Sequence, residues 1–130
     1  MSDTIEIGGE PLGLREVFKV AGGTRVSLAK GVQARVEAAR QVVETRMAYD
    51  EPVYGVTTGF GALAEVKIAP EQIAQLQRNL ILSHAAGVGN NLSRRETRAM
   101  MLLRAQTLAA GHSGTRLLIL NRIIDMLNYG

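Results

Sequence analysis

The second half of this sequence contains helical segments that are too apolar for the surface of a small, independent domain. Three segments, 69–87, 94–110 and 114–128, repeat apolar residues at the three- and four-residue spacing of an α-helix. In the first of them, Ile81 and Leu82 lie away from the main apolar stripe, so more than one side of that helix requires cover. We therefore predict a mainly α-helical chain that is part of a larger helical bundle or an oligomer.

Local signals predict where these helices begin and end. Pro70 suits the first position of a helix, and Ser93 with Glu96 forms a capping box. Gly87 is expected to end the first helix and Gly111 the second.

The helix at 94–110 has an apolar side and a basic region. Four residues are expected on one apolar side: Ala99, Leu102, Leu103 and Ala110. Its arginines are expected to form a solvated or salt-bridged face, since no aromatic residues interleave with them as in single-strand nucleic-acid binders. They are Arg94, Arg95, Arg98 and Arg104.

The N-terminal part of the chain mixes short elements. Residues 4–7 and 25–28 predict a small two-stranded patch, and 12–20 predicts a short helix between them. Residues 28–47 predict a longer surface helix with one apolar stripe, formed by Val32, Val36, Ala39 and Val43.

Composition excludes several classes of protein. The chain has 130 residues, the length of one ordinary domain, and only 4% are aromatic, so its core must be aliphatic. It has no cysteine, which excludes a disulfide scaffold, a thiolate zinc site and a cysteine nucleophile, and we expect a reducing compartment, the cytoplasm. No apolar run approaches the roughly 20 residues that span a bilayer, and no secretory signal is recognisable. A net charge of +3 is weak support for a polyanion partner, so neither nucleic acid nor membrane is expected to bind.

Residues 50–68 interrupt the helical pattern with a glycine-rich loop. Three glycines fall within seven positions, at 55, 59 and 61. The loop lacks the Gly-Lys-Ser/Thr ending of a phosphate-binding Walker loop and the Gly-x-Gly-x-x-Gly pattern. Two interpretations stay open: a structural turn, or a loop whose backbone a substrate approaches, with Tyr54 and the hydroxyls of Thr57 and Thr58 facing it.

Tyr54 and His84 carry side chains that could take part in chemistry. A phenol is protonated at neutral pH, so Tyr54 can donate a proton as it stands; to accept one it needs positive charge or helix dipoles nearby. His84 lies on the apolar stripe of its helix, where a histidine is more often a hydrogen-bonded core residue than a ligand. No metal site is expected, because no other His, Asp or Glu lies at ligand spacing, and His112 is expected in a turn between helices.

Three stretches resemble the N-terminal part of the aromatic amino acid lyase family, which includes histidine, phenylalanine and tyrosine ammonia-lyases and related aminomutases. They are VYGVTTGFG at 53–61, LQRNLILSHAAGVG at 76–89 and LAAGHSGTR at 108–116. They occur in the family's order and spacing, and the resemblance covers about residues 10–130.

The resemblance implies a mostly helical homotetramer with active sites shared between subunits. It also implies an electrophile, methylidene-imidazolone (MIO), formed from an internal Ala-Ser-Gly, and elimination of ammonia from an aromatic amino acid. Tyr54 matches the family's proposed acid/base for the β-proton. Gly61 matches a loop glycine whose backbone approaches the substrate, and His84 matches a histidine that lines the pocket around the substrate side chain.

The resemblance also bears on the substrate. SHAAG at 83–87 looks most like histidine ammonia-lyases, so L-histidine, converted to urocanate, is the favoured substrate. Tyrosine enzymes also tend to carry His here, whereas phenylalanine-specific members tend to carry an apolar residue. The stretch at 108–113 resembles tyrosine aminomutases too, so a tyrosine ammonia-lyase or a tyrosine 2,3-aminomutase is the alternative.

The sequence departs from the family pattern in lacking Ala-Ser-Gly. In the family this triad, and the arginine that holds the substrate carboxylate, come after the helix predicted here at 114–128. We therefore expect residues 1–130 to be the N-terminal portion of an ammonia-lyase domain, with a Tyr/Gly loop at 50–68 and core helices at 69–130. Such a portion would be a fragment, a truncated product or one half of a split enzyme.

By itself the chain is expected to be inactive and to associate with itself or with the rest of the lyase. The alternative of another class is a non-catalytic helical module that binds an aromatic amino acid or assembles with a complete lyase.

Overall fold

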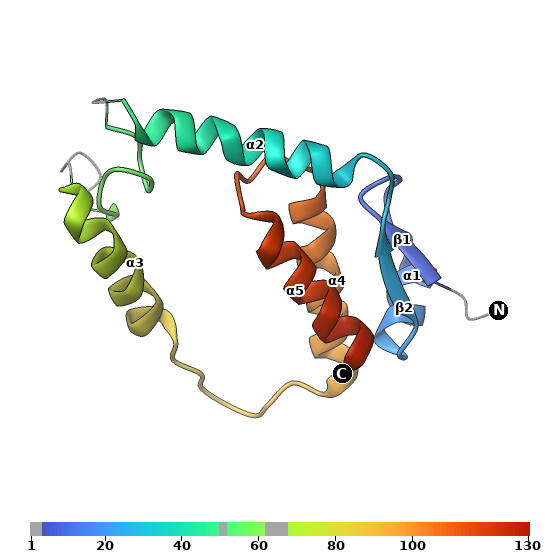
Figure 1. The fold of residues 1–130 in the computed structure, drawn as a ribbon. Coiled ribbons are helices and arrows are strands. Elements are labelled where there is room, and N and C mark those ends of the chain that lie inside the picture. Colours follow the sequence, from blue (N-terminus) through green and yellow to red (C-terminus); the bar gives the residue numbers. More distant parts are fainter. Residues whose placement is uncertain (1–3, 50–51, 62–67) are drawn as a thin grey trace. The chain divides into compact units, whose positions relative to one another are not determined.

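The computed structural model describes residues 4–49, 52–61 and 68–130, which fall into two units. The first unit joins Met1–Val42 to Asn91–Gly130, and the second is Val43–Asn90. The described residues form five helices and one two-stranded sheet, which confirms the predicted mainly helical architecture (Figure 1). None of these helices is both long and apolar enough to cross a membrane.

The sheet of the first unit confirms the predicted two-stranded patch. Strands β1 (Thr4–Ile7) and β2 (Arg25–Leu28) are parallel, with Ile5 opposite Val26. They are parallel because helix α1 (Leu14–Ala21) connects them and returns the chain to the same end of the sheet.

Helices α4 (Arg94–Ala109) and α5 (Leu117–Tyr129) pack against each other, and α4 also packs against α1. The predicted capping box is present: the Ser93 hydroxyl accepts from the Glu96 N–H at 3.3 Å, and the Glu96 carboxylate accepts from the Ser93 N–H at 2.7 Å. The core between these elements is aliphatic, as predicted from the scarcity of aromatic residues. Its members are Ile7, Val20, Val26, Ala29, Val32, Val36, Leu102, Ala105, Leu108, Ala109, Leu120 and Leu127.

The predicted apolar side of α4 is wrong in two of its four residues. Leu103 and Ala110 are exposed, and the buried face instead runs through Leu102, Ala105 and Ala109. This face is one step around the helix from the predicted one, and it includes a charged residue, Arg98.

The prediction that Arg98 belongs to a solvated basic face is wrong. Its side chain is 6% exposed, and its guanidinium donates to three backbone carbonyls: Val20 at 2.8 Å, Leu127 at 2.6 Å and Thr24 at 3.2 Å. Leu127 lies in the last turn of α5, where a helix leaves carbonyls without helical partners, whereas the Val20 carbonyl at the end of α1 also accepts from the Gly23 N–H at 3.0 Å. The other three arginines of the helix are exposed, as predicted: Arg94, Arg95 and Arg104.

Helix α2 (Val32–Met47) starts later than predicted. Residue Leu28 ends β2, and Gly31 adopts a positive φ of 83°, so the helix begins only at Val32. The predicted stripe is confirmed, since Val32 and Val36 are buried and the other two members are half-buried. The helix ends at Met47, as predicted.

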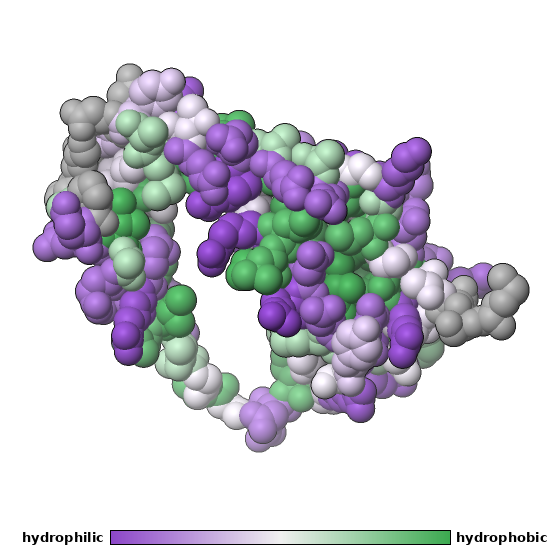
Figure 2. All heavy atoms as spheres, viewed as in Figure 1, coloured by the Kyte–Doolittle hydropathy of each residue, from purple (hydrophilic) through white to green (hydrophobic). Residues whose placement is uncertain are grey.

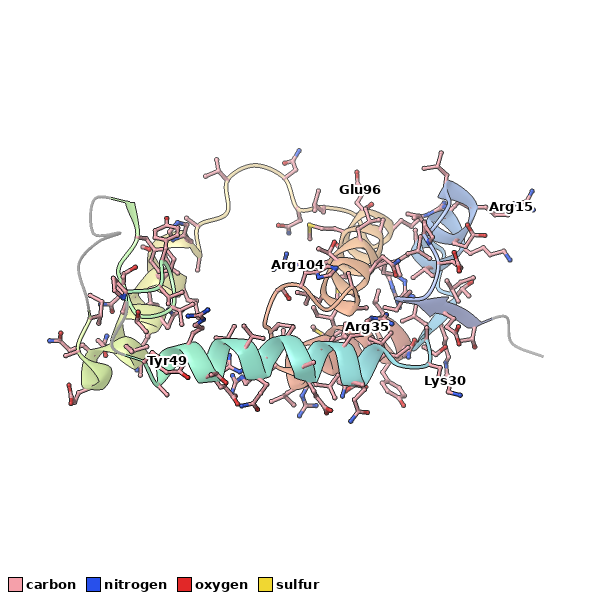
Figure 3. The ribbon with its side chains drawn as sticks, turned by 90° about the horizontal axis from the view of Figure 1, so that it is seen from above. Arg15, Lys30, Arg35, Tyr49, Glu96 and Arg104 are labelled. Atoms are coloured by element: carbon pink, nitrogen blue, oxygen red, sulfur yellow. The ribbon has the colours of Figure 1, made fainter. Side chains whose placement is uncertain are left out.

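Arg35 connects α2 to the end of α4. It projects from α2 (Figure 3) and donates to the backbone carbonyls of Gly8 and, at 3.3 Å, of Ala109. Gly111 follows α4 with a φ of 77°, and a Cβ there would lie 2.8 Å from Arg35 Cβ. Only glycine fits this crossing without displacement.

Apolar side chains also lie on the surface of the helices. Figure 2 shows hydrophobic residues gathered over α4 and α5 on the face in view, and Leu103, Leu118 and Met126 are each more than half exposed. This exposure agrees with the prediction that the helices need cover beyond what this chain supplies.

Candidate active site

Tyr54 lies in a tight turn of the second unit. The carbonyl of Val53 accepts hydrogen bonds from the N–H groups of Val56 and Thr57, both at 3.0 Å. Gly55 has a φ of 71°, a conformation that side-chain-bearing residues rarely adopt. The turn therefore depends on the glycine that directly follows the tyrosine.

The phenol of Tyr54 faces outward and has one aromatic neighbour. Its side chain is 63% exposed, and its ring meets Phe60 edge-on, with centroids 6.0 Å apart and an angle of 72°. A Cβ at Gly55 would lie 3.1 Å from Phe60 Cε1, so the same glycine makes room for this ring. Phe60 was not singled out from the sequence, although one of only two phenylalanines in the chain, placed between two glycines, is a usable signal.

The interpretation in which the hydroxyls of Thr57 and Thr58 face a substrate is wrong for this structure. Thr57 is 5% and Thr58 is 1% exposed. The Thr57 hydroxyl accepts from the Val53 N–H at 2.8 Å, and the Thr58 hydroxyl accepts from the Gly55 N–H at 3.2 Å. Both hydroxyls are therefore used by the backbone of their own loop.

Gly61 is open on its side-chain face. It has a φ of 56°, and an added Cβ would meet no atom of the described residues within 4 Å. Residues 50–51 and 62–67 of the predicted Tyr/Gly loop lie outside the described residues, so the described part of the loop is 52–61 and residue 68.

Helix α3 (Pro70–His84) begins at the predicted proline but ends three residues before the predicted Gly87. The side chains of Ser83 and His84 both approach the Leu80 carbonyl, at 2.9 Å each. These side-chain contacts reach back to a carbonyl of the preceding turn, as polar side chains near a helix end often do.

His84 is exposed in this chain, so the expectation of a core histidine from the helical pattern is wrong. Its Nδ1 lies 2.9 Å from the Leu80 carbonyl oxygen, which can only accept. This contact assigns the proton to Nδ1 in the neutral ring and leaves Nε2 as an acceptor. The Ser83 hydroxyl, 3.0 Å from Nδ1, lies beside the same carbonyl.

The Tyr54 turn is attached to the start of α3, whereas His84 is at its end. The N–H of Ile68, two residues before α3, donates to the Thr57 carbonyl at 3.0 Å. From Pro70 to His84 the helix rises about 21 Å at 1.5 Å per residue. Among the described residues, no hydrogen bond or ring contact joins Tyr54 to His84.

The described residues offer little for a cofactor or a metal. They contain no group of three His, Asp or Glu side chains that could hold a metal ion. MIO forms from Ala-Ser-Gly in the family, and that triad is absent from the 130 residues, so this chain does not fit the group. A hollow of about 230 Å³ runs along α3, and it is lined by Ile68, Gln72, Gln75, Leu76 and Asn79 rather than by the predicted site residues.

The helical architecture and the exposed tyrosine of a glycine loop agree with the resemblance to the aromatic amino acid lyases. Residues 12–130 match the family model described as aromatic amino acid lyase, and the chain belongs to that family. It is 50% identical over 125 residues to a histidine ammonia-lyase of Stigmatella aurantiaca, a match that covers 95% of this chain and 24% of the relative.

Solved structures of related enzymes have the same fold as this chain. The ergothioneine-degrading enzyme ergothionase of Treponema denticola superimposes with a TM-score of 0.92 at 33% identity, covering 98% of this chain and 26% of that one. A tyrosine aminomutase of Streptomyces globisporus superimposes with a TM-score of 0.89 at 35% identity, covering 97% and 24%. The chain thus spans about a quarter of the length of the relatives that it matches.

Proposed function

We propose that this chain is the N-terminal part of an ammonia-lyase that converts L-histidine to urocanate and ammonia. The observation that carries the proposal is the 50% identity to a histidine ammonia-lyase across 95% of the chain. We further propose that the protein acts in the cytoplasm, on the basis of its lack of cysteine.

Tyr54 is proposed as the acid/base of the reaction. In the elimination, the phenolate oxygen takes the β-proton, the electron pair of the Cβ–H bond becomes the second bond between Cα and Cβ, and the Cα–N bond breaks to release ammonia. The 63% exposure of Tyr54 supports this role, since the phenol is accessible to a ligand. The electrophile used by the family is not formed by these 130 residues, so we propose that the isolated chain is inactive.

His84 and Gly61 are proposed to bind the substrate. With Nδ1 donating to Leu80, the Nε2 of His84 can accept a hydrogen bond from the N–H of a substrate imidazole. At Gly61 no side chain separates a ligand from the backbone, and its surroundings are open.

The test assembles this chain with the part of a lyase that carries Ala-Ser-Gly and measures urocanate formation from L-histidine. We expect activity in the assembly, none in the isolated chain, and a collapse of kcat in Tyr54→Phe. His84→Leu should lower kcat/KM for histidine by about tenfold or more, the worth of a lost hydrogen bond to a substrate polar group. An assembly that acts on none of the aromatic amino acids contradicts the proposal, and an unchanged rate in Tyr54→Phe removes Tyr54 from its role.

The second candidate is a tyrosine ammonia-lyase or a tyrosine 2,3-aminomutase. It is supported by the likeness to the Streptomyces globisporus tyrosine aminomutase, and the phenol of tyrosine is also a donor to Nε2 of His84. The same assembly, given L-tyrosine, discriminates the three activities by product: ammonia with an unsaturated acid, a β-amino acid without net loss of ammonia, or neither.

The candidate of another class is a non-catalytic module that associates with itself or with a lyase subunit. The exposed apolar residues on α3, α4 and α5 favour association. Sedimentation of the isolated chain, and titration against a complete lyase, distinguish a monomer from an assembling module.

A further inference from the structure

The backbone on both sides of Tyr54 is held by threonine hydroxyls. The N–H that precedes the tyrosine, on Val53, donates to Thr57 Oγ1 at 2.8 Å. The N–H that follows it, on Gly55, donates to Thr58 Oγ1 at 3.2 Å, and this hydroxyl donates in turn to the Gly59 carbonyl at 3.0 Å. Thr58 therefore fixes the peptide group between Tyr54 and Gly55, and Thr57 fixes the peptide group between residues 52 and 53, one residue before the tyrosine.

The two threonines are buried, whereas the tyrosine whose loop they hold is exposed. Thr57 and Thr58 are almost fully buried, whereas Tyr54 is 63% exposed. The two N–H groups are part-buried, so losing the acceptor would leave each with part of its desolvation cost, and each hydroxyl therefore favours the observed turn. The outward direction of the phenol thus follows from contacts made beneath it.

Thr57 also connects the turn to the start of α3. The Thr57 N–H donates to the Val53 carbonyl, and the Thr57 carbonyl accepts from Ile68 at the start of α3, both at 3.0 Å. The tyrosine is consequently oriented relative to α3 through Thr57.

We propose that Thr57 and Thr58 are positioning residues for Tyr54, which hold its backbone so that the phenol oxygen is presented to the substrate. The inference rests on the proposed function of Tyr54. It assigns a catalytic consequence to two hydroxyls that do not contact the substrate themselves.

The first test measures the hydrogen bonds in this chain without any activity. Amide hydrogen exchange should accelerate by about tenfold or more at Val53 in Thr57→Val and at Gly55 in Thr58→Val, since valine retains the shape of threonine without its hydroxyl. Thr107→Val is the matched control, because the Thr107 hydroxyl bonds the Leu103 carbonyl on α4 and should affect neither amide. Unchanged exchange at both amides overturns the proposal.

The second test uses the assembled lyase. Thr57→Val and Thr58→Val should each lower kcat by about tenfold or more with KM for the amino acid little changed, because a small displacement of a catalytic group is costly to the rate. Thr57→Ser and Thr58→Ser retain the hydroxyl and should restore kcat, and Thr107→Val should leave it at the wild-type level.

The outcomes separate this inference from the proposed function. If Tyr54→Phe abolishes activity while both valine variants retain the wild-type kcat, the positioning role is wrong and the function of Tyr54 stands. The same conclusion follows if the valine variants lose kcat and the serine variants do not restore kcat. If Tyr54→Phe has no effect, or the assembly is inactive on every aromatic amino acid, the proposed function fails and this inference fails with it.

Discussion

The side-chain amide of Asn128 bonds both backbone groups of Val26, which lies 102 positions earlier in the chain. The Val26 N–H donates to Oδ1 at 2.8 Å, and Nδ2 donates to the Val26 carbonyl at 2.9 Å. Strand β2 pairs with β1 along one edge, and Asn128 occupies hydrogen-bonding groups that the partner strand does not use. One side chain of α5 therefore substitutes for a third strand.

Replacing Asn128 should destabilise the first unit. Asn128→Ala leaves a donor and an acceptor of Val26 unpaired, and we expect a loss of about 2 kcal/mol in the free energy of unfolding. Asn121→Ala, at an exposed position of the same helix, is the control and should change it by less than about 0.5 kcal/mol. Urea unfolding followed by circular dichroism measures both, and equal midpoints would show that the amide contributes nothing.

Arg98→Met should be more harmful, because it removes the donor to three carbonyls at once. We expect a loss of about 3 kcal/mol or more. Arg104→Met, at an exposed position of α4, is the matched control and should unfold like the wild type. If Arg98→Met does not fold, Arg98→Lys, which has no planar fork to reach all three carbonyls, should still fold with reduced stability. A lysine variant as stable as the wild type would contradict this role for the guanidinium.

Gly111→Ala should destabilise through both conformation and space. Its φ is 77°, and the new Cβ would lie 2.8 Å from Arg35 Cβ and 3.1 Å from the Arg35 carbonyl carbon. We expect a cost of about 2 kcal/mol or more from the strained backbone and the overlap. Gly87→Ala provides the comparison, since no atom in the described part of the chain lies within 4 Å of its added Cβ and its φ is not positive. A lower midpoint of thermal unfolding for Gly87→Ala than for Gly111→Ala would refute the explanation.

The capping box of α4 should make the first unit sensitive to acid. Hydrogen bonds from the Ser93 hydroxyl and backbone lower the pKa of Glu96 below its ordinary value of 4.5. A carboxyl with a lowered pKa in the folded state contributes stability that is present above 4.5 and is lost as pH falls through the folded-state pKa. Wild type should therefore lose more stability than Glu96→Gln between neutral pH and pH values well below 4.5.

Thermal unfolding at both pH values checks this prediction. Ser93→Ala removes the stronger of the two hydrogen-bonding causes and should reduce the acid sensitivity in part. Identical acid sensitivity in all three proteins would show that the Glu96 carboxylate is not the group involved.

Local signals in the sequence were sufficient where neighbouring residues decide the structure. The capping box at Ser93, the proline start of α3, and the stripe of α2 all depend on residues within one or two turns, and each was predicted correctly. The burial of Arg98 was not predictable in this way, because its acceptors are 29, 74 and 78 positions away.

The candidate site shows the same division. The turn around Tyr54 follows from its glycines, which sequence patterns reveal. The inward use of the Thr57 and Thr58 hydroxyls depends on which face of the loop is buried, and an isolated Thr-Thr pair carries no information about that. The end of α3 at His84 is not signalled in the sequence, because Ala85 and Ala86 have no tendency to stop a helix.

The bond between Asn128 and Val26 also has a consequence for synthesis on the ribosome. At about 5–20 residues per second, Val26 emerges roughly 5–20 s before the amide that completes its pairing. Arg98 meets its last acceptor, Leu127, only at the same late stage. During that interval the parallel strand pair and α1 lack the helices that bury them, and this early segment is the part of the nascent chain that a chaperone would encounter uncovered.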